Sequence, residues 1–299
     1  MTGGLGFIGT RLCAALLDQG DELRVVDDLS GHHAEGAGAT AAATLAARGA
    51  EIAIAPAGPA DLDGVDAVIH LAGLPGVRIR RTASAFHEAN VLLTESLVRG
   101  ASVAGARFVL VSSSSVYGNA PELPTPERAP RVPLNPYAAS KVTAEDVVRE
   151  HGTDAVIVRP FSVYGPGQRP EMAFARWIDC LRAGRPLPWH ASPGTARDFT
   201  YVDDAVAGIR AALRRGRARE AYNLSGWSCV DLRAALGVLE NAFGRRASLA
   251  TARGSTAEAH VTHGCGRKAA AELGYRPRTD LASGLRKQVA AVSPDRLAA

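Results

Sequence analysis

The 299-residue sequence predicts an α/β fold, in which a doubly wound parallel sheet is followed by a smaller C-terminal region. Short apolar runs alternate with amphipathic stretches over the first two thirds, which implies right-handed crossovers between parallel strands. A glycine-rich turn opens the first amphipathic stretch, and the pattern changes after Pro160. The expected strands are residues 23–26, 52–55, 67–71, 107–112 and 155–159, and the expected helices between them are residues 8–19, 85–104 and 136–150.

The chain changes character after Pro160. Residues 165–197 are rich in proline, glycine and arginine and enclose one helix, while residues 203–214 predict another helix and 221–224 a short strand. Residues 231–299 predict two or three helices joined by loops. We therefore expect a first domain of residues 1–160, to which residues 198–215 return, and a smaller region of residues 161–197 and 216–299.

The composition argues against several functional classes. The chain is 46% hydrophobic and 21% charged, with a net charge of +4, which is typical of a globular protein. Its basic residues form no cluster interleaved with aromatic residues, so we expect no nucleic-acid partner. The four cysteines lack metal-ligand spacing, so we expect no metal. No signal peptide and no bilayer-spanning apolar run are visible, so we expect a cytoplasmic protein without membrane contact.

The sequence 2-TGGLGFIG-9 places Gly3, Gly6 and Gly9 at the start of the first helix. Glycines at this spacing allow a tight turn and let a pyrophosphate approach the backbone closely. The start of the helix adds free N–H groups and the positive end of its dipole. The turn therefore predicts a Rossmann-type dinucleotide site.

Asp27 identifies the dinucleotide. It follows the strand at 23–26, at the distance from the glycine turn where a carboxylate binds the ribose hydroxyls of adenosine and repels a 2′-phosphate. Neither Asp28 nor Leu29 is basic, which favours NAD over NADP. In addition, 70-HLAG-73 ends another strand with small residues that let the backbone lie against the cofactor.

Tyr137 and Lys141 lie four residues apart in 137-YAASK-141 and share one face of a predicted helix. A lysine ammonium beside a phenol lowers the phenol pKa, and the positive charge of NAD⁺ acts in the same direction. Tyr137 is therefore a candidate general base. The serine-rich strand end 112-SSSSVYG-118 faces the same crevice, where one hydroxyl can bond the oxygen that is oxidised.

Together these motifs resemble the extended short-chain dehydrogenases/reductases, specifically the NAD-dependent epimerase/dehydratase family. The resemblance runs through TGGLGFIG, VVDDLSG, HLAG, SSSSVYG, YAASK, VRPFSVYGP, RDFTYVDD, YNLS and LGYRPRT, nearly the whole chain. It implies that Ser113, Tyr137 and Lys141 are catalytic. It also implies a set of cofactor-lining residues: Gly3, Gly6, Phe7, Ile8, Gly9, Asp27, Asp28, Leu29, Ser30, Leu71, Ala72, Gly73, Asn90, Tyr137, Lys141 and Phe161.

The two residues after Ser113 separate branches of the family. Similar 4,6-dehydratases carry Asp-Glu there and UDP-glucuronate decarboxylases carry a Glu at the second position, whereas this chain has Ser114 and Ser115. A serine hydroxyl has no suitable pKa for acid or base catalysis near neutral pH. Dehydration is therefore disfavoured, and decarboxylation less strongly. Epimerisation at C4 of a nucleotide sugar, through a transient 4-keto sugar with NAD regenerated, is the expected reaction.

The segment 164-YGPGQRPEMAF-174 is similar to that of UDP-glucuronate 4-epimerases, as is 76-GVR-78. We therefore expect a UDP-sugar, preferably a uronate, as the substrate. The expected substrate-binding residues are hydroxyls and arginines for the uronate and the diphosphate: Arg78, Ser113, Ser114, Ser115, Ser162, Arg169, Arg197 and Arg267. The alternatives are a UDP- or dTDP-glucose/galactose 4-epimerase, a UDP-glucuronate decarboxylase, and a non-catalytic NAD-binding regulatory module.

The chain departs from the family pattern in three places. Residues 55–57 lack the acidic residue that reaches adenine in the family, and residues 261–267 replace an Ala-Asp-x-Ser-Lys pattern on the nucleotide side. Only Met1 precedes Thr2, so we expect a chain start placed several residues late in the first strand. The family also implies a homodimer formed through the helices at 85–104 and 136–150.

Overall fold

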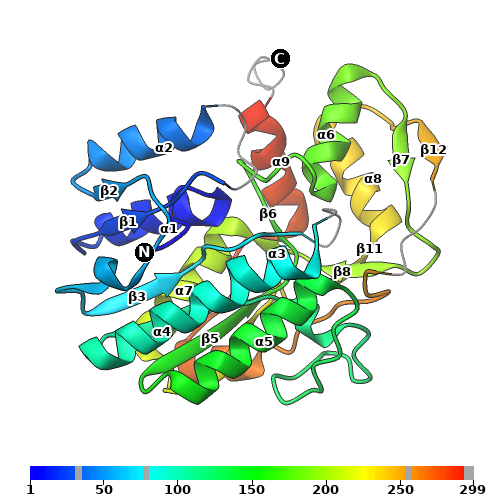
Figure 1. The fold of residues 1–299 in the computed structure, drawn as a ribbon. Helices are drawn as coiled ribbons and strands as arrows, with labels where there is room; N and C mark the ends of the chain where they lie inside the picture. Colours follow the sequence, from blue (N-terminus) through cyan, green and yellow to red (C-terminus); the bar gives the residue numbers. More distant parts are fainter. Residues whose placement is uncertain (31–35, 77–80, 253–256, 293–299) are drawn as a thin grey trace.

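The computed structural model describes residues 1–30, 36–76, 81–252 and 257–292. Its centre is a parallel sheet with the order β2–β1–Thr2–β3–β4–β5–β10, which is a doubly wound arrangement (Figure 1). The predicted fold class is therefore confirmed. The strands are β1 (Arg24–Val26), β2 (Glu51–Ala53), β3 (Ala67–His70), β4 (Arg107–Val111), β5 (Ala155–Pro160) and β10 (Ala221–Leu224).

Residues 1–3 occupy the place of a strand between β1 and β3. The Thr2 amide donates to the Ile69 carbonyl at 3.1 Å, and the Gly3 amide donates to the Val26 carbonyl at 3.0 Å. Thr2 thus bridges both neighbours in parallel register, and only a single residue of this central strand pairs on both sides. The pairing brings the glycine-rich turn to the carboxyl edge of the sheet, where ligands bind in such folds.

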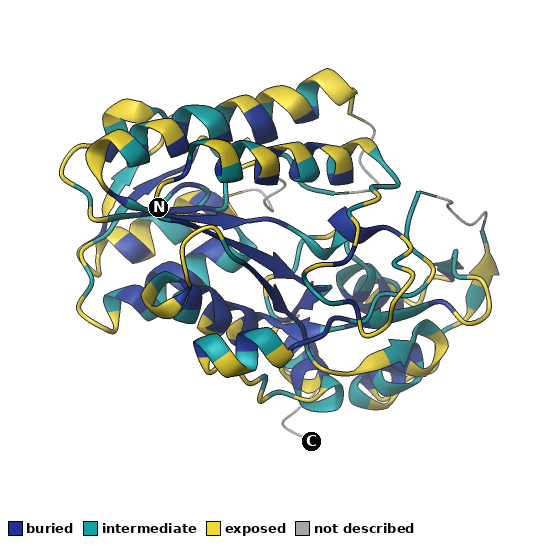
Figure 2. Ribbon diagram, turned by 90° about the horizontal axis from the view of Figure 1, so that it is seen from below, coloured by how far each residue is buried: buried dark blue, intermediate teal, exposed yellow. Residues whose placement is uncertain are grey.

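Helices cover both faces of the sheet. On one face, Leu97 and Val148 pack with Phe108 of β4, whereas on the other Leu12 and Ile209 pack with Val109. The alternate residues of β4 therefore belong to two different cores, and its neighbour β5 is buried at every position (Figure 2). The helices of the first face are α3 (Ala83–His87), the π-helical turn η2 (Glu88–Leu92), α4 (Leu93–Ala104) and α5 (Pro136–His151), and those of the second are α1 (Phe7–Leu17) and α7 (Val202–Arg215).

One helix was not predicted from the sequence. Residues Ala37–Ala46 form α2, which lies beside α1 and β2. Its side chains are mostly alanine, so it lacks the amphipathic period that identifies a surface helix, and it buries only Gly38 and Leu45. Alanine has the highest helix propensity, which explains why the segment is helical.

The smaller region has its own core beside the carboxyl edge of the sheet. Tyr164, Phe174 and Phe199 pack together there, and the ring centroids of Phe174 and Phe199 lie 4.7 Å apart. The elements of the smaller region are β6 (Val163–Tyr164), α6 (Ala173–Ala183), β7 (Leu187–Trp189), β8 (Ala196–Asp198), β9 (Thr200–Tyr201), β11 (Cys229–Asp231), α8 (Leu232–Phe243), β12 (Leu249–Thr251) and α9 (Leu281–Val292). The domain boundaries expected from the sequence stay a prediction.

Three short helical turns complete the elements: η1 (Pro59–Leu62), η3 (Ser114–Tyr117) and the π-helical η4 (Ala269–Leu273). Within the described part of the chain, no helix has both the length and the apolar character needed to cross a bilayer.

Candidate active site

A long cleft of about 1530 Å³ separates the carboxyl edge of the sheet from the smaller region. Its volume exceeds the roughly 300–1,000 Å³ of a typical pocket for one small ligand, so it has room for a dinucleotide and a second molecule. Most of the sequence-predicted site residues lie on its wall: Gly3, Gly6, Phe7, Ile8, Gly9, Asp27, Asp28, Ser30, Leu71, Ala72, Gly73, Ser113, Ser114, Ser115, Tyr137, Lys141, Ser162, Arg169 and Arg197.

The glycine-rich turn is packed too tightly for side chains at two of its three positions. Gly3 has a φ of +68°, and a Cβ there would lie 2.5 Å from the Ala72 amide nitrogen. A Cβ at Gly9 would lie 2.4 Å from the Gly3 carbonyl oxygen. Gly6 caps α1 without a side-chain hydrogen bond, so the first N–H groups of the helix are left for a ligand.

Asp27 fastens this turn to the loop after β1. One carboxylate oxygen accepts from the Leu5 amide at 2.9 Å and the other from the Leu29 amide at 3.0 Å. A carboxylate can accept about four hydrogen bonds, so Asp27 keeps acceptor capacity for ribose hydroxyls. The next residue, Asp28, is exposed and accepts from the amide and hydroxyl of Ser30.

Ser113 follows β4 by two residues and caps η3. Its Oγ accepts the Ser115 amide at 3.2 Å and the Ser115 hydroxyl at 2.9 Å. With two donors directed at its oxygen, the Ser113 hydroxyl is free to donate its own proton. A hydrogen bond between Ser113 and Tyr137 is one of the interactions that lower the Tyr137 pKa. The structure thus brings together two of the three predicted catalytic side chains.

The Tyr137 pKa is nevertheless raised, because burial of the phenol outweighs the effects of Ser113 and of the Arg169 charge. The sequence had predicted a lowered value. Lys141 itself is buried, donates to the Val111 carbonyl at 3.3 Å, and has its pKa lowered to about 8 by desolvation. In the protein alone, burial therefore acts against the charged form of both groups.

Asn90 lies behind the wall of the cleft. Its amide nitrogen donates to the Leu74 carbonyl at 3.1 Å and to Ser140 Oγ at 2.9 Å. Its Oδ1 is buried and has no partner among the described residues, and a Cβ at Gly73 would lie 2.5 Å from it. An unpaired buried acceptor is costly, so this oxygen marks a place where a ligand donor is favoured.

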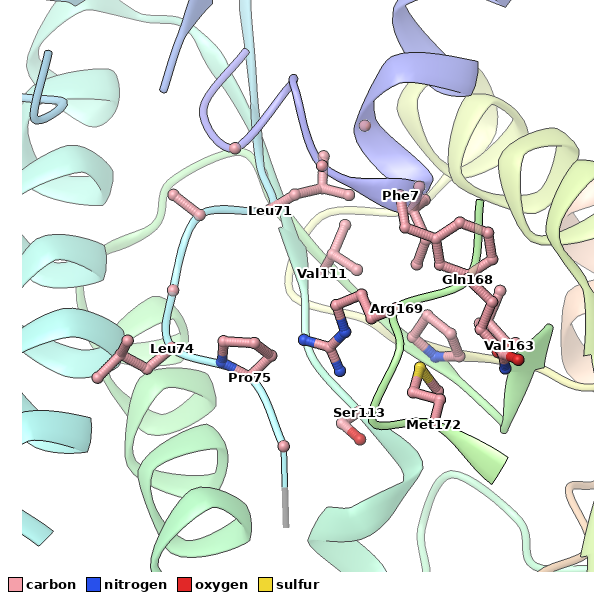
Figure 3. Close-up of a pocket in the computed structure, with 18 of the residues that line it drawn as sticks. Phe7, Leu71, Leu74, Pro75, Val111, Ser113, Val163, Gln168, Arg169 and Met172 are labelled. Atoms are coloured by element: carbon pink, nitrogen blue, oxygen red, sulfur yellow. The ribbon is translucent and has the colours of Figure 1, made fainter. Parts of the chain in front are cut away.

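Arg169 and Arg197 bring positive charge to the other part of the cleft. Arg169 lies in the cleft near Ser113 and Met172 (Figure 3), and its Nε lies 3.1 Å from Glu171 Oε1. Arg197 forms an ion pair with Glu258 at 3.3 Å. A phosphate or carboxylate that binds either arginine therefore competes with an acid already present.

Five predicted site residues do not line the cleft or are not described. Phe161 packs into a core with Val116 and Tyr117, because it follows the buried strand β5. Leu29 instead packs in the core beside α1 and β1. Arg267 is exposed and directs its Nε to Cys265 at 3.5 Å. Asn90 acts from behind Gly73, as described above, and Arg78 lies outside the described residues.

Sequence reasoning overlooked several residues of the cleft wall, including Gln168 and Glu258. Gln168 lies within the segment 164–174, directly before Arg169, and could have been included on that basis, whereas Glu258 lies in a stretch without a recognisable pattern. Among the described residues, no group of histidine, cysteine and acidic side chains could hold a metal ion.

Comparisons with known proteins show the family to which the chain belongs. Residues 1–225 match the model of the NAD dependent epimerase/dehydratase family. A UDP-glucuronate 4-epimerase of Thermodesulfobacterium geofontis is 32% identical over 233 residues, which cover 75% of this chain and 72% of that protein. A dTDP-glucose 4,6-dehydratase of Streptomyces griseus is 33% identical over 309 residues, which cover 97% of this chain and 92% of that protein.

A solved structure of similar shape also contains both expected ligands. The UDP-glucuronic acid 4-epimerase from Bacillus cereus, in complex with UDP-glucuronic acid and NAD, has a TM-score of 0.92 and 28% identity, with 98% of each chain covered. The matched family is NAD dependent by its description, and this neighbour binds NAD. The cofactor predicted from the glycine-rich turn is thereby confirmed.

Proposed function

Because the chain belongs to the NAD dependent epimerase/dehydratase family, we propose that it is a 4-epimerase that interconverts UDP-glucuronate and UDP-galacturonate. The observation that carries the proposal is the end of the cleft where Tyr137 and Ser113 meet two further serines and Arg169. This part of the cleft has a base and a hydroxyl for the reacting oxygen. It also has a cation, Arg169, and the Ser114 hydroxyl, both suited to a carboxylate.

The cleft fits NAD on three observations. The uncrowded Gly6 leaves the start of α1 open to a pyrophosphate, Asp27 retains acceptor capacity, and Asn90 Oδ1 is an unpaired acceptor among the described residues. We assign the adenosine ribose to Asp27 and Asp28 and the nicotinamide half to the region of Gly73, Tyr137 and Lys141. When bound, NAD⁺ supplies a reversible acceptor for the hydride on C4 of the sugar.

In the proposed mechanism, Tyr137 removes the proton from the C4 hydroxyl and returns it at the end of the cycle. Ser113 donates a hydrogen bond that stabilises the phenolate, and the Lys141 ammonium adds positive charge on the same helix face. Inversion requires the 4-keto sugar to turn over before it is reduced on its opposite face. Arg197 leaves its ion pair with Glu258 to bind a phosphate, and it holds the diphosphate while the sugar rotates.

The branch of the family is inferred from positions 114 and 115. Both are serines on the wall of the cleft, so neither can serve as the acid or base that eliminates water or assists loss of CO₂. Dehydration is therefore disfavoured, even though a dTDP-glucose 4,6-dehydratase is similar to nearly the whole chain.

NMR spectroscopy of the product formed from UDP-glucuronate in the presence of NAD⁺ tests the proposal. We expect inversion at C4, and we expect Tyr137→Phe to lower kcat by about 10²–10⁴-fold while the protein stays folded. A pentose product with release of CO₂ would instead identify a decarboxylase. Turnover of UDP-glucose but not of the uronate would contradict the assigned substrate, and no turnover of any nucleotide sugar would favour a regulatory NAD-binding module.

Arg169→Met separates uronate from neutral-sugar recognition. If Arg169 binds the C6 carboxylate, the variant should lose about tenfold or more in kcat/KM for UDP-glucuronate, since a charge-assisted hydrogen bond contributes about 1.5–3 kcal/mol. Any residual activity on UDP-glucose, which lacks the carboxylate, should change much less. An equal loss on both sugars would mean that Arg169 has another role.

A further inference from the structure

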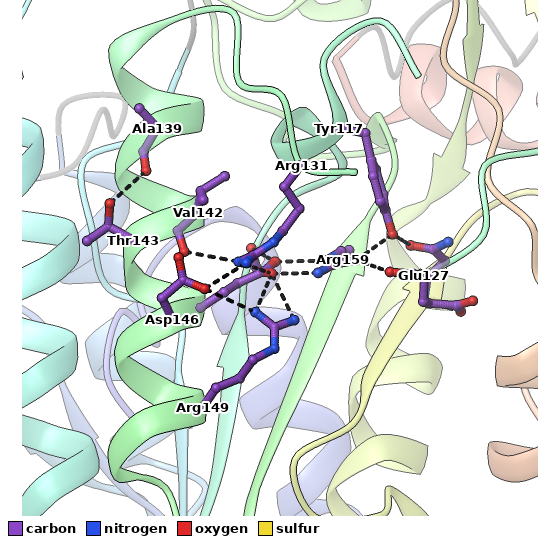
Figure 4. A network of polar contacts seen from close by, with 12 residues as sticks. Tyr117, Glu127, Arg131, Ala139, Val142, Thr143, Asp146, Arg149 and Arg159 are labelled. Carbon is purple, nitrogen blue, oxygen red and sulfur yellow. Dashed lines mark hydrogen bonds and ion pairs between the residues drawn. The ribbon is translucent and has the colours of Figure 1, made fainter. Parts of the chain in front are cut away.

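Glu145 lies on α5, one turn after Lys141, and is completely buried beneath the cleft. It forms a two-pronged ion pair with Arg159 of β5, through Nε at 2.8 Å and Nη2 at 2.6 Å (Figure 4). The Arg159 side chain is only 1% exposed. Burying an ion pair is costly even when its geometry is good, so a role other than stability has to be considered.

The same carboxylate fixes α5 against the end of β4. Ser112 Oγ donates to Glu145 Oε1 at 2.7 Å, and the preceding residue, Val111, accepts from Lys141 Nζ at 3.3 Å. Two consecutive residues at the end of β4 are therefore bonded by two residues one turn apart on α5. The next residue along the chain is Ser113, and the preceding turn of the helix carries Tyr137. The relative position of these two hydroxyls depends on this pairing.

Glu145 also acts on the charge of Lys141. Burial lowers the Lys141 pKa, and the negative charge of Glu145 opposes this shift. From β3, His70 faces the same ammonium, but burial and the Lys141 charge lower its pKa to about 3, so it is neutral. Tyr137, on the preceding turn of α5, has a raised pKa and adds no charge while its phenol is protonated. Glu145 is therefore the acid whose charge supports the cation.

Three arginines keep Glu145 ionised. Oε2 accepts from Arg159 and lies 3.4 Å from Arg131 and 3.3 Å from Arg149. The hydrogen bonds and charge of Arg159 outweigh burial and lower the Glu145 pKa. Arg159 in turn donates to the Tyr117 hydroxyl at 2.6 Å. The three arginines, labelled in Figure 4, reach this carboxylate from the segment before α5, from α5 and from β5.

We propose that Glu145 is a positioning residue for the active site: it holds α5 against the end of β4 and keeps the buried Lys141 ammonium cationic, while Arg159, Arg149 and Arg131 together keep Glu145 ionised. The link to catalysis rests on the proposed function, in which Tyr137 needs the neighbouring cation. The electrostatic part concerns the protein alone and is testable without any substrate.

A stability cycle tests the charge coupling. The free energy of unfolding is compared between wild type and Lys141→Met from about pH 6 to about pH 10. The Lys141 pKa is lower in the folded protein than in the unfolded chain, so above about pH 8 only the unfolded chain keeps the lysine proton. The free energy of unfolding of the wild type therefore rises with pH in this range. The free energy of unfolding of Lys141→Met minus that of the wild type declines accordingly. In a Glu145→Gln background, the same decline should begin about one pH unit lower.

Arg159→Met is the matched control, because it breaks the same ion pair but leaves the acid in place beside Arg131 and Arg149. We expect the Lys141 transition to stay or to move to higher pH in this variant. A purely structural role would make both variants behave alike. Should Glu145→Gln fail to fold, the double variant Glu145→Gln/Arg159→Met removes both buried charges and should still show the downward shift.

The catalytic consequence is read from pH profiles of kcat/KM. Loss of the cation above its pKa should bring the alkaline limb of the Glu145→Gln profile to lower pH, and Arg159→Met should not do so. An unchanged Lys141 transition in both variants that lack the acid overturns the proposal. Absence of epimerase activity in the wild type would overturn the proposed function alone, since the stability cycle still decides the coupling.

Discussion

At the scale of single residues, the direction of one hydrogen bond determines what the serine cluster does. Ser115 donates hydrogen bonds from both its amide and its hydroxyl to Ser113 Oγ. The sequence predicted Ser115 as a substrate-binding hydroxyl, and this stays a prediction. In the structure Ser115 orients Ser113, so that the Ser113 proton is directed to Tyr137.

This arrangement predicts different kinetics for two neighbouring substitutions. Ser113→Ala should lower kcat by about 10²-fold or more and move the acid limb of the pH profile to higher pH, because the Tyr137 pKa loses an interaction that lowers it. Ser115→Ala should lower kcat only a few-fold and leave KM unchanged. Steady-state kinetics across pH measure both effects. A raised KM with unchanged kcat in Ser115→Ala would show that Ser115 contacts the substrate after all.

At the scale of elements, two glycines of the glycine-rich turn, Gly9 and Gly6, have different surroundings and can be compared directly. An alanine Cβ at Gly9 would meet the backbone of Gly3 and Gly4 at 2.4–2.8 Å, whereas at Gly6 it would have one neighbour, the Gly3 carbonyl, at 3.6 Å. Gly6 also has an ordinary φ of −78° and lies on the cleft wall. The two glycines therefore serve different purposes: Gly9 permits the fold of the turn, and Gly6 leaves room for the ligand.

We expect Gly9→Ala to lower the free energy of unfolding by about 1–3 kcal/mol even without cofactor, as overpacking does. Gly6→Ala should cost less than about 1 kcal/mol without cofactor, since it introduces only an ordinary contact. It should, however, abolish most of the thermal stabilisation that added NAD⁺ gives the wild type. Thermal unfolding with and without NAD⁺ measures both quantities. Equal loss of stability in the two cofactor-free variants would contradict this division of roles.

The elements that the sequence predicted well were those with a clear period. The strand at 221–224 and the helix at 136–150 agree with β10 and α5 to within a residue. Two differences have physical causes: α2 is mostly alanine and lacks an apolar stripe, and the helix expected at 85–104 contains the π-helical turn η2 around the buried Asn90. Hydrophobic periodicity carries no information about either feature.

The site was predictable where a motif combines spacing and chemistry, as for Tyr137 and Lys141. The network beneath it was missed, although two signals were present. Glu145 follows Lys141 by one helical turn, and Arg159 interrupts an otherwise apolar strand. A charged residue in a buried strand requires a partner, but the partner comes from a different element and depends on the tertiary structure.

At the scale of the whole molecule, Asp198 joins the sheet to the smaller region. It is completely buried on β8 and accepts from the Gly226 amide, after β10, at 2.6 Å and from the Gly264 amide at 3.1 Å. Burial raises its pKa to about 7, and these two hydrogen bonds only partly compensate. A carboxyl that links three segments of the fold therefore titrates near neutral pH.

The raised pKa gives the stability of the whole protein a defined dependence on pH. Between about pH 4 and about pH 7 the folded protein keeps a proton that the unfolded chain releases, so the stabilisation is complete below the unfolded pKa and is lost as the pH rises towards 7. The loss is on the order of 4 kcal/mol, since a tenfold difference in proton affinity between the folded and unfolded states corresponds to about 1.4 kcal/mol.

Asp198→Asn should remove this component, because the amide does not titrate but can still accept from Gly226. The difference in free energy of unfolding between wild type and Asp198→Asn should therefore favour the wild type more at pH 5 than at pH 7.5, as measured by denaturant titration at each pH. Asp203→Asn, which alters a half-exposed carboxylate paired with Arg11, should leave the wild-type slope in place. If the Asp198→Asn difference is constant across this range, the buried carboxyl does not titrate there, and the pH dependence of unfolding arises from other groups.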